Sequence, residues 1–296
     1  MNKKRKAEKK STSAQKPKAP AKRSIKAALS VATSAKKPSE DRVAAFAEVP
    51  LAVCESDENL QAMLNVLRNK DEPIEVRYAA LEALQAASFS VVAFESCRSE
   101  YIATLRAVAT DPDPELRQRV LGILAREKDG FAQKKLLEGL QKPEKALVPP
   151  EKALQLLSYD IHAEAYELAR EIVKDPPNTA AKREALRLLA ADATAAPLFE
   201  KILRDKDELP EIRQVSAAAL QSLNPEKLQG YAREALLDSS ESDEIQATSL
   251  TALTHFGDAE AIAKDETLKK QIDKLSAAAS TTLKQSAREF LKKYSQ

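Results

Sequence analysis

The amino-acid sequence predicts an all-α protein, an α-solenoid of about seven antiparallel helix pairs preceded by a basic tail. Three observations support this fold class. The 296 residues include only 5 glycines and 4% aromatic residues against 31% charged residues, a composition typical of helices packed through small and aliphatic side chains. Apolar residues recur at helical spacing along most of the chain. A turn of characteristic sequence also returns at intervals in the thirties, as a repeat array requires.

The chain begins with a basic tail, and the uneven distribution of formal charge along the sequence marks it. Residues 1–38 carry 13 Lys or Arg and a single acid, whereas residues 39–296 carry a net charge of −10. The tail has few large apolar side chains to offset its chain entropy, so we expect it to be disordered. We therefore divide the chain into a disordered basic tail, residues 1–40, and an α-solenoid, residues 41–296.

Electrostatic docking to DNA, RNA or an acidic protein is one function of such a tail. The candidate contacts are Lys3, Lys4, Arg5, Lys6, Lys9, Lys10, Lys16, Lys18, Lys22 and Arg23. Two alternatives stay open: a solubilising tail without a partner, and a tail that lies on the chain's own acidic body. In a eukaryotic cell residues 3–6 would also serve as a nuclear import signal.

The helices of the body follow in order after an N-terminal capping helix at residues 41–54. The first helices of the pairs are expected at residues 57–69, 99–109, 131–140, 163–173, 196–205, 226–237 and 267–275. The second helices follow the pattern V-R-x-x-A-L-x-x-L, in which the second position is most often a base. This base position falls at residues 77, 117, 150, 182, 213, 246 and 284. Its spacing of 31 to 40 residues indicates stacked helical pairs.

The turn 111-DPDPELRQRV-120 explains how two helices of a pair can be joined closely. Asp111 and Asp113 can accept backbone N–H bonds and cap the next helix. Pro112 ends the preceding helix, and Pro114 suits the first turn of the next, where its missing N–H costs nothing.

The segments 71-DEPIEVRYAALEAL-84, 111-DPDPELRQRVLGIL-124 and 207-DELPEIRQVSAAAL-220 resemble HEAT repeats, close to the short bacterial type first noted in phycobilisome lyases. The resemblance covers roughly residues 57–293. It implies an α-solenoid whose second helices line a concave surface, and a structural ladder between turn acids and helix bases. The implied ladder pairs are Asp71 with Arg77, Asp111 or Asp113 with Arg117, Asp207 with Arg213 and, less closely matched, Asp175 with Lys182. Pro150 and Gln246 lack the base, so the ladder is expected to be interrupted there.

The residues of the second helices that point away from the buried stripe form the candidate binding row. They are Tyr78, Glu82, Gln118, Gln155, Arg183, Arg187, Gln214 and Gln221, continued by Thr251 and Thr254. A groove that follows phosphates should show a stripe of Lys and Arg, whereas this row is mostly neutral. We expect it to bind a protein or peptide, and expect any nucleic acid to bind through the tail.

No pattern in the sequence predicts a reaction. Cys54 and Cys97 are expected to be reduced, buried thiols of a cytoplasmic protein. His162 is better explained by the helix that begins near it than as a metal ligand, and His255 by the end of a helix. No nucleotide-binding loop, nucleophile motif, zinc motif or apolar run of transmembrane length occurs.

The predicted function is a non-enzymatic protein-interaction scaffold or adaptor without cofactor or metal. The alternatives are a nucleic-acid-associated protein held by its tail and a lyase-type enzyme or enzyme subunit. The sequence identifies neither the partner nor the oligomeric state.

Overall fold

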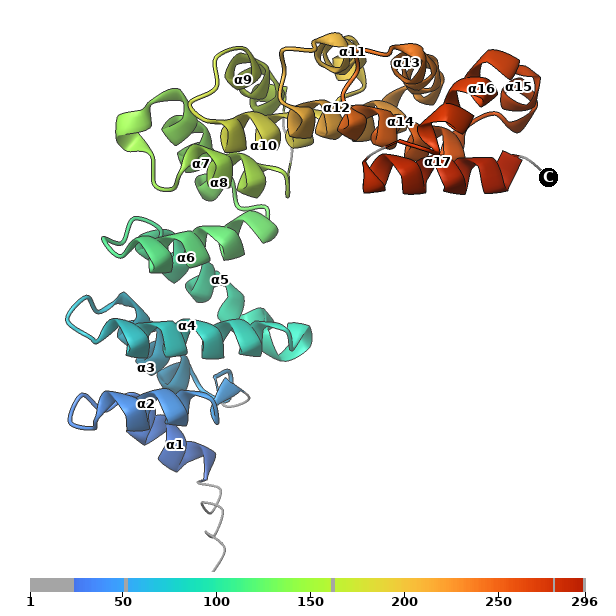
Figure 1. Cartoon of the computed structure of the whole chain (residues 1–296). Coiled ribbons are helices and arrows are strands. Elements are labelled where there is room, and N and C mark those ends of the chain that lie inside the picture. Colours follow the sequence, from blue (N-terminus) through green and yellow to red (C-terminus); the bar gives the residue numbers. More distant parts are fainter. Residues whose placement is uncertain (1–23, 51–52, 161–162, 279, 295–296) are drawn as a thin grey trace, which may run out of the picture. The chain divides into compact units, whose positions relative to one another are not determined.

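The structure is a computed structural model that describes residues 24–50, 53–160, 163–278 and 280–294. These residues form helices and turns without a β-strand, which confirms the predicted all-α class (Figure 1). The chain divides into two compact units, residues 1–104 and 105–296. No helix in the described part of the chain is long and apolar enough to cross a membrane.

The first unit contains an N-terminal helix pair that the sequence analysis places partly in the tail. Its helices are α1 (Ile25–Ala32), α2 (Ser39–Phe46), α3 (Asp57–Arg68), α4 (Ile74–Ser88) and the larger part of α5 (Val91–Val108). α1 packs on α2, α3 packs on α4, and α2 contacts α4. The predicted capping helix is thus shorter than expected and has a partner.

The predicted boundary of the tail at residue 40 is wrong, because residues 24–38 belong to the folded unit. The hydroxyl of Ser24 accepts a hydrogen bond from the Ala27 N–H and caps α1. Ala28, Leu29 and Ala32 are buried on one side of this short helix. Small side chains allow it to pack closely on α2, so a segment of low overall hydrophobicity still has a core face. The ten candidate tail contacts lie outside the described residues.

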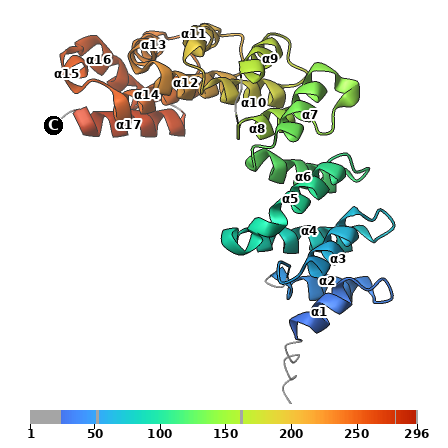
Figure 2. The ribbon, with the colours of Figure 1, turned by 180° about the vertical axis from the view of Figure 1, so that it is seen from behind.

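The second unit repeats the pair as expected (Figure 2). Its helices are α6 (Pro114–Arg126), α7 (Gly130–Gln141), α8 (Pro150–Leu157), α9 (Ala163–Lys174), α10 (Thr179–Leu189), α11 (Ala196–Arg204), α12 (Pro210–Leu223), α13 (Pro225–Leu237), α14 (Asp243–Phe256), α15 (Ala259–Lys264), α16 (Glu266–Leu275) and α17 (Thr281–Tyr294). The second helices contact one another in chain order, from α6 through α8, α10, α12 and α14 to α17. The first helices α7, α9, α11, α13 and α16 pack against these second helices, and buried apolar residues of both rows form the core.

The turn before α6 has the predicted structure. The Asp113 carboxylate accepts a hydrogen bond from the Leu116 N–H at 2.7 Å, and the Asp111 carboxylate accepts one from the Asp113 N–H at 3.0 Å. Pro114 is the first residue of α6. These contacts satisfy donors that have no partner within the helix.

Arginines at the base position of the second helices make a recurrent contact that the sequence analysis does not foresee. The Nε–H of Arg42, Arg77 and Arg213 donates to the carbonyl oxygen ten residues earlier, at 3.0, 3.0 and 2.9 Å. That carbonyl is at the end of the first helix of the same pair, where backbone acceptors lack a partner within the helix. The arginine therefore fastens the two helices of a pair together.

The predicted acid–base ladder exists, but most of its assigned partners are wrong. The observed ion pairs are Arg42 with Glu72, Lys182 with Glu208, and Arg213 with Glu241. Each base reaches forward to a glutamate in the following turn, 26 to 30 residues away. The expected acids Asp71, Asp175 and Asp207 are exposed, whereas Asp111 and Asp113 take part in the turn before their own helix.

Arg117 and Gln246 extend the ladder through backbone carbonyls. Arg117 donates to the carbonyl of Leu147 at 2.5 Å, in the turn before α8, and to that of Asp111 at 2.7 Å. It therefore joins neighbouring pairs as predicted, although not through a carboxylate. Gln246 donates to the carbonyl of Asp238 at 3.1 Å, so the contact to the preceding helix persists where a base is missing.

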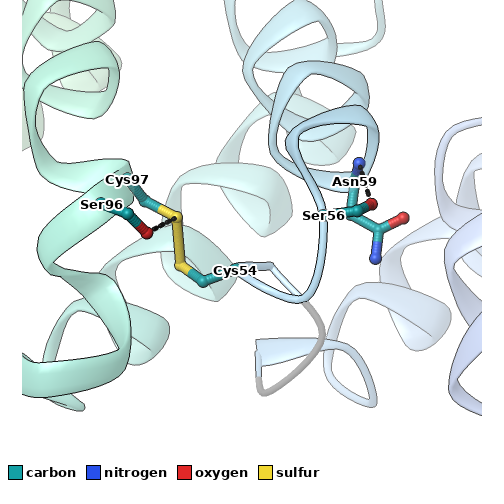
Figure 3. The surroundings of a disulfide bond; sticks show 5 residues. All are labelled: Cys54, Ser56, Asn59, Ser96 and Cys97. Carbon is teal, nitrogen blue, oxygen red and sulfur yellow. Dashed lines mark hydrogen bonds between the residues drawn. A yellow bond between two sulfur atoms is a disulfide. The ribbon is translucent and has the colours of Figure 1, made fainter.

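Cys54 and Cys97 form a disulfide bond, contrary to the expectation of two reduced thiols (Figure 3). Cys54 lies in the loop before α3 and Cys97 lies in α5, 43 positions later. The fold brings their Cα atoms to 6.3 Å, within the range that a disulfide spans. The expectation of a cytoplasmic location rested on reduced thiols, so the bond removes that support.

Candidate functional site

The predicted binding row is distributed over five helices of the two units. Tyr78 and Glu82 lie on α4, Gln118 on α6, Gln155 on α8, Arg183 and Arg187 on α10, and Gln214 and Gln221 on α12. Each of these side chains is exposed or half-buried, as expected for a surface row. The structure brings Gln214, Gln221 and Thr251 together in one described cavity. The assignment of Thr254 to this row is wrong, because its side chain is buried and its hydroxyl donates a hydrogen bond to the Leu250 carbonyl.

That cavity is an open groove of about 560 Å³ in the second unit, and we call it the α14 groove. It lies against α12, α14 and the N-terminal part of α17, and one further wall residue, Leu228, comes from α13. Its walls are Gln214, Ala217, Ala218, Gln221, Leu228, Asp243, Glu244, Ala247, Thr248, Thr251, Ala252, Phe256, Ser280, Thr282 and Ser286. Alanines, threonines and serines dominate this set, so the backbones of the three helices can be approached closely from solvent. Its size is in the range of ligand pockets.

One residue that lines the groove has a buried polar atom that lacks a partner. The side-chain carbonyl oxygen of Gln221 is buried, and no donor in the described structure reaches it. A buried acceptor without a hydrogen bond is costly, and this atom is itself shielded from solvent.

The two ends of α14 give the groove two chemically different ends. Asp243 and Glu244 form the first turn of α14, and both are exposed. Phe256 is the last residue of the helix, and 55% of its surface is exposed. Gly257 follows with its N–H bonded to the Leu253 carbonyl at 2.9 Å. A Cβ at this position would collide with that carbonyl and with Ile262, so glycine is required where the helix ends.

The sequence analysis missed the acidic end and Phe256. Acids in the first turn of a helix, such as Asp243 and Glu244, are usually explained by stabilisation of the helix N-terminus. The sequence therefore provided no separate reason to place them in a binding groove. Phe256 directly precedes a glycine, which reads as the end of a helix. The signal that the sequence did offer was an aromatic residue at the end of a helix.

Arg183 and Arg187 do not form a free basic stripe. Arg187 pairs with Glu184 at 2.6 Å, and Arg183 lies 3.6 Å from both Glu184 and Glu211. The pair therefore belongs to a mixed charged surface.

A buried polar cluster supports the helices of the groove. The Arg213 guanidinium donates to Glu241 at 2.6 and 2.8 Å and to the Tyr231 hydroxyl at 2.6 Å. Burial would lower the pKa of Arg213, but its hydrogen bonds with Glu241 outweigh this and raise it. Burial would raise the pKa of Glu241, but the hydrogen bond with Arg213 lowers it below the ordinary value. Burial raises the pKa of Tyr231. The cluster ties α12 to α13 and to the turn before α14.

Neither histidine identifies a reactive site. His255 is exposed in the last turn of α14, where the sequence analysis placed it, and His162 lies outside the described residues. Within the described ranges no group of three or more His, Cys, Asp or Glu could hold a metal ion.

Comparison with known proteins identifies the repeat. Residues 60–156 match the family model for HEAT repeats, so this segment is similar to HEAT repeats, as its turn sequences indicate. The matched segment includes most of α3, all of α4 to α7 and most of α8. No curated protein matches the chain.

Solved structures that resemble the chain have low sequence identity. An engineered protein matches with a TM-score of 0.42 and 16% identity over 92% of this chain and 89% of its own. Human deoxyhypusine hydroxylase in complex with glycerol matches with a TM-score of 0.35 and 16% identity, over 83% and 99%. The complex of CpcE and CpcF of phycocyanin lyase from Nostoc sp. PCC7120 matches with a TM-score of 0.40 and 17% identity, over 90% and 100%.

Proposed function

We propose that the protein is a non-enzymatic interaction scaffold that binds a peptide segment of a partner protein in the α14 groove. The observation that carries the proposal is the groove itself. It is open, about 560 Å³ in volume, and lined mainly by Ala, Thr and Ser from three neighbouring helices. An open groove of this kind admits an extended chain more readily than it encloses a small molecule.

The chemistry of the walls also supports binding over catalysis. The described residues that line the groove include no His, Cys, Lys or Arg, and their carboxylates, Asp243 and Glu244, are exposed in the first turn of α14. Backbone and side-chain polar atoms can still form hydrogen bonds with a peptide. In this proposal the α14 groove is the specific binding surface of the HEAT-like scaffold.

A peptide-library selection tests this proposal. The full chain and its Thr251→Arg variant are immobilised and screened against a random peptide library. Thr251 lines the groove and is exposed, so arginine should fill the groove without disturbing the core. We expect peptides selected on the native chain to lose binding to the variant. The control is Thr267→Arg, at an exposed position of α16 outside the groove. Selected peptides that bind both variants and the native chain equally would refute the proposal.

A second candidate function is polyanion binding, which the tail sequence first suggested. One observation in α17 favours it. Lys284, Arg288 and Lys292 recur every four residues and line one shallow cleft of about 350 Å³. None of the three pairs with a carboxylate among the described residues. Such a row adds cations independent of the tail.

Salt dependence and a tail deletion test this second candidate. If DNA or RNA binds mainly through the tail and the α17 row adds to it, deletion of residues 1–23 should weaken binding strongly, and affinity should fall steeply as salt increases. Binding by the deleted chain at unchanged strength and salt dependence would contradict a tail-held complex.

A further inference from the structure

The cations on α17 indicate which kind of polyanion fits that helix. We call Lys284, Arg288 and Lys292 the α17 row; together they line one shallow cleft. Resting on the second candidate function, polyanion binding, we propose that the α17 row docks an extended acidic segment of another protein. The carboxylates of that segment bind the three cations.

The repeat pattern shows that this side of α17 differs from the other second helices. In α17 the position four residues after the base position is Arg288, and it is exposed. In every other second helix the same position is apolar and buried, as Phe46, Leu81, Leu121, Leu154, Leu186, Ala217 and Leu250. α17 packs on α14, α15 and α16, whereas the described walls of the cleft come from α17 alone. The row therefore lies on a side of α17 that no other described helix covers.

Bases at the position of Lys284 bind carboxylates elsewhere in this chain. Arg42, Lys182 and Arg213 each reach forward to a glutamate in the following turn. Lys284 occupies the same position in α17, and it makes no ion pair with any described residue. The ladder thus places at Lys284 a cation whose equivalents hold a carboxylate supplied by a neighbouring segment.

The local charge of α17 is opposite to that of the body around it. Residues 281–294 contain four Lys or Arg and one acid, although residues 39–296 together have a net charge of −10. Arg288 and Lys292 are exposed, and neither pairs with a carboxylate in the described structure. Unpaired cations of this density on an acidic body attract an anionic partner to this one helix.

The remaining walls of the cleft favour a peptide over a nucleic acid. Glu289 is exposed in the same cleft, where it accepts a hydrogen bond from Gln285 at 3.1 Å. Its carboxylate would repel a continuous chain of phosphates, whereas it can accept an N–H from a peptide backbone. No aromatic side chain contributes to the described walls, so a base has no platform on which to stack.

The geometry of α17 sets the spacing of the carboxylates. Lys284, Arg288 and Lys292 recur every four residues, which is about 6 Å along the helix axis. Side chains on one face of an extended peptide recur every two residues, or about 6.6 Å. A segment with Glu at alternate positions therefore presents one carboxylate to each cation.

Two occupants from this protein do not meet the description. The tail, residues 1–23, carries ten Lys or Arg and one acid. A second copy that stacked its first helix pair on α17 would present Lys37. The glutamates of the ladder lie five residues before the next base position, and Lys37 lies five residues before Arg42. Repulsion between like charges opposes both arrangements, so the occupant that we infer belongs to another protein.

Binding of a synthetic peptide to the full chain tests the inference. The reference peptide carries a fluorophore and has Glu at alternate positions in a Ser/Ala background, and a matched peptide has Gln at those positions. We expect the variant Lys284→Gln/Arg288→Gln/Lys292→Gln to bind the Glu peptide about tenfold more weakly than the native chain at low salt. The Gln peptide should bind neither chain.

The matched control is Lys174→Gln/Lys201→Gln/Lys270→Gln, which removes the same charge from exposed positions outside the cleft. It should bind the Glu peptide as the native chain does. The tail is present in every chain, so a second readout locates the contact. A photoreactive group in the Glu peptide, followed by mass spectrometry, should give cross-links to residues 281–294 that are lost in the variant of the α17 row.

Three outcomes would overturn the inference. Equal weakening by the two triple variants would show that only net charge matters. An oligonucleotide that binds residues 281–294 more tightly than the Glu peptide would identify a nucleic-acid site, and polyanion binding by the row would stand with a different occupant. Self-association of the native chain in sedimentation that the row variant loses would identify a second copy as the occupant.

Two further results separate this inference from the proposed functions. If neither the Glu peptide nor an oligonucleotide contacts residues 281–294, the contribution of the α17 row to the second candidate function fails together with the inference. The Thr251→Arg variant, which fills the α14 groove, should bind the Glu peptide as tightly as the native chain does. A loss of the Glu peptide in that variant would place the peptide in the α14 groove and refute its docking on α17.

Discussion

At the scale of single residues, buried bases organise the contacts between helices. The side chains of Arg213 and Glu241 expose only 3% and 4% of their surface, so solvent and salt have little access to the pair. The guanidinium contacts a helix end, a tyrosine hydroxyl and a carboxylate from the next turn. A buried pair of this kind adds little net stability over an apolar pair, yet removal of one partner is costly.

Glu241→Gln should therefore lower the free energy of unfolding by about 3 kcal/mol, because Arg213 would be left with a buried uncompensated charge. Urea unfolding followed by circular dichroism measures the loss. Glu115→Gln is the control, since Glu115 pairs with Arg119 on an exposed helix surface and should contribute less than about 1 kcal/mol. Equal losses in the two variants would contradict a special role for the buried pair.

The same pair predicts a pH dependence. The pKa of Glu241 in the folded chain lies below its ordinary value of 4.5. A carboxyl whose pKa is lowered by folding contributes stability above the unfolded pKa and loses it as the pH falls through the folded value. The difference in stability between the native chain and Glu241→Gln should thus be constant from pH 7 to 5 and shrink below about 4.5. Urea titrations at several pH values provide the measurement, and a difference that grows as the pH falls would refute the assignment.

Gly257 is a second residue whose identity the fold dictates. An added Cβ would meet the Leu253 carbonyl and the Ile262 side chain, and the carbonyl belongs to the helix backbone. Gly257→Ala should cost about 1–3 kcal/mol through overpacking. Gly230→Ala is the matched control, because nothing lies within 4 Å of its Cβ position and alanine favours the helix. Urea unfolding of both variants distinguishes them, and a stable Gly257→Ala chain would contradict the steric argument.

At the scale of the elements, caps and prolines determine where each helix begins. Asp113 caps α6, Asp129 caps α7, and Asp258 caps α15 through side-chain oxygens. Proline opens α6, α8, α12 and α13. These residues act over three or four positions, so the helix starts follow from local sequence.

Asp113→Ala should destabilise the second unit by about 1 kcal/mol, because the Leu116 N–H loses its acceptor. Asp113→Ser keeps an oxygen at the cap and should recover most of the loss. Thermal unfolding of both variants tests this expectation. An alanine variant as stable as the serine variant would show that the cap contributes nothing.

At the scale of the whole molecule, the chain consists of two compact units with different constraints. The first contains the disulfide, which links the loop before α3 to α5 across 43 positions. The second contains the α14 groove. Each unit can therefore respond separately to a change in conditions.

Reduction of the Cys54–Cys97 bond should destabilise the first unit by about 4 kcal/mol or less, because the loop regains conformational entropy in the unfolded state. Hydrogen exchange with and without reductant, read separately for residues 57–104 and 196–256, measures the effect. We expect faster exchange in the first segment and unchanged exchange in the second. A Cys54→Ser/Cys97→Ser chain should match the reduced protein in both segments. Equal exchange with and without reductant would show that the bond does not stabilise the unit.

The sequence by itself determined the all-α class, the helix pairs and the caps, because each depends on residues within one or two helical turns. It also located Gln214 and Gln221 on an outward face. It could not pair Arg213 with Glu241, join Cys54 to Cys97, or bring Phe256 into one groove with Ser280. Those contacts join residues 24 to 43 positions apart, and only the packing angles of successive helices determine which of them meet. Local periodicity fixes which face of a helix is buried, whereas the tertiary structure decides what that helix contacts in the next pair.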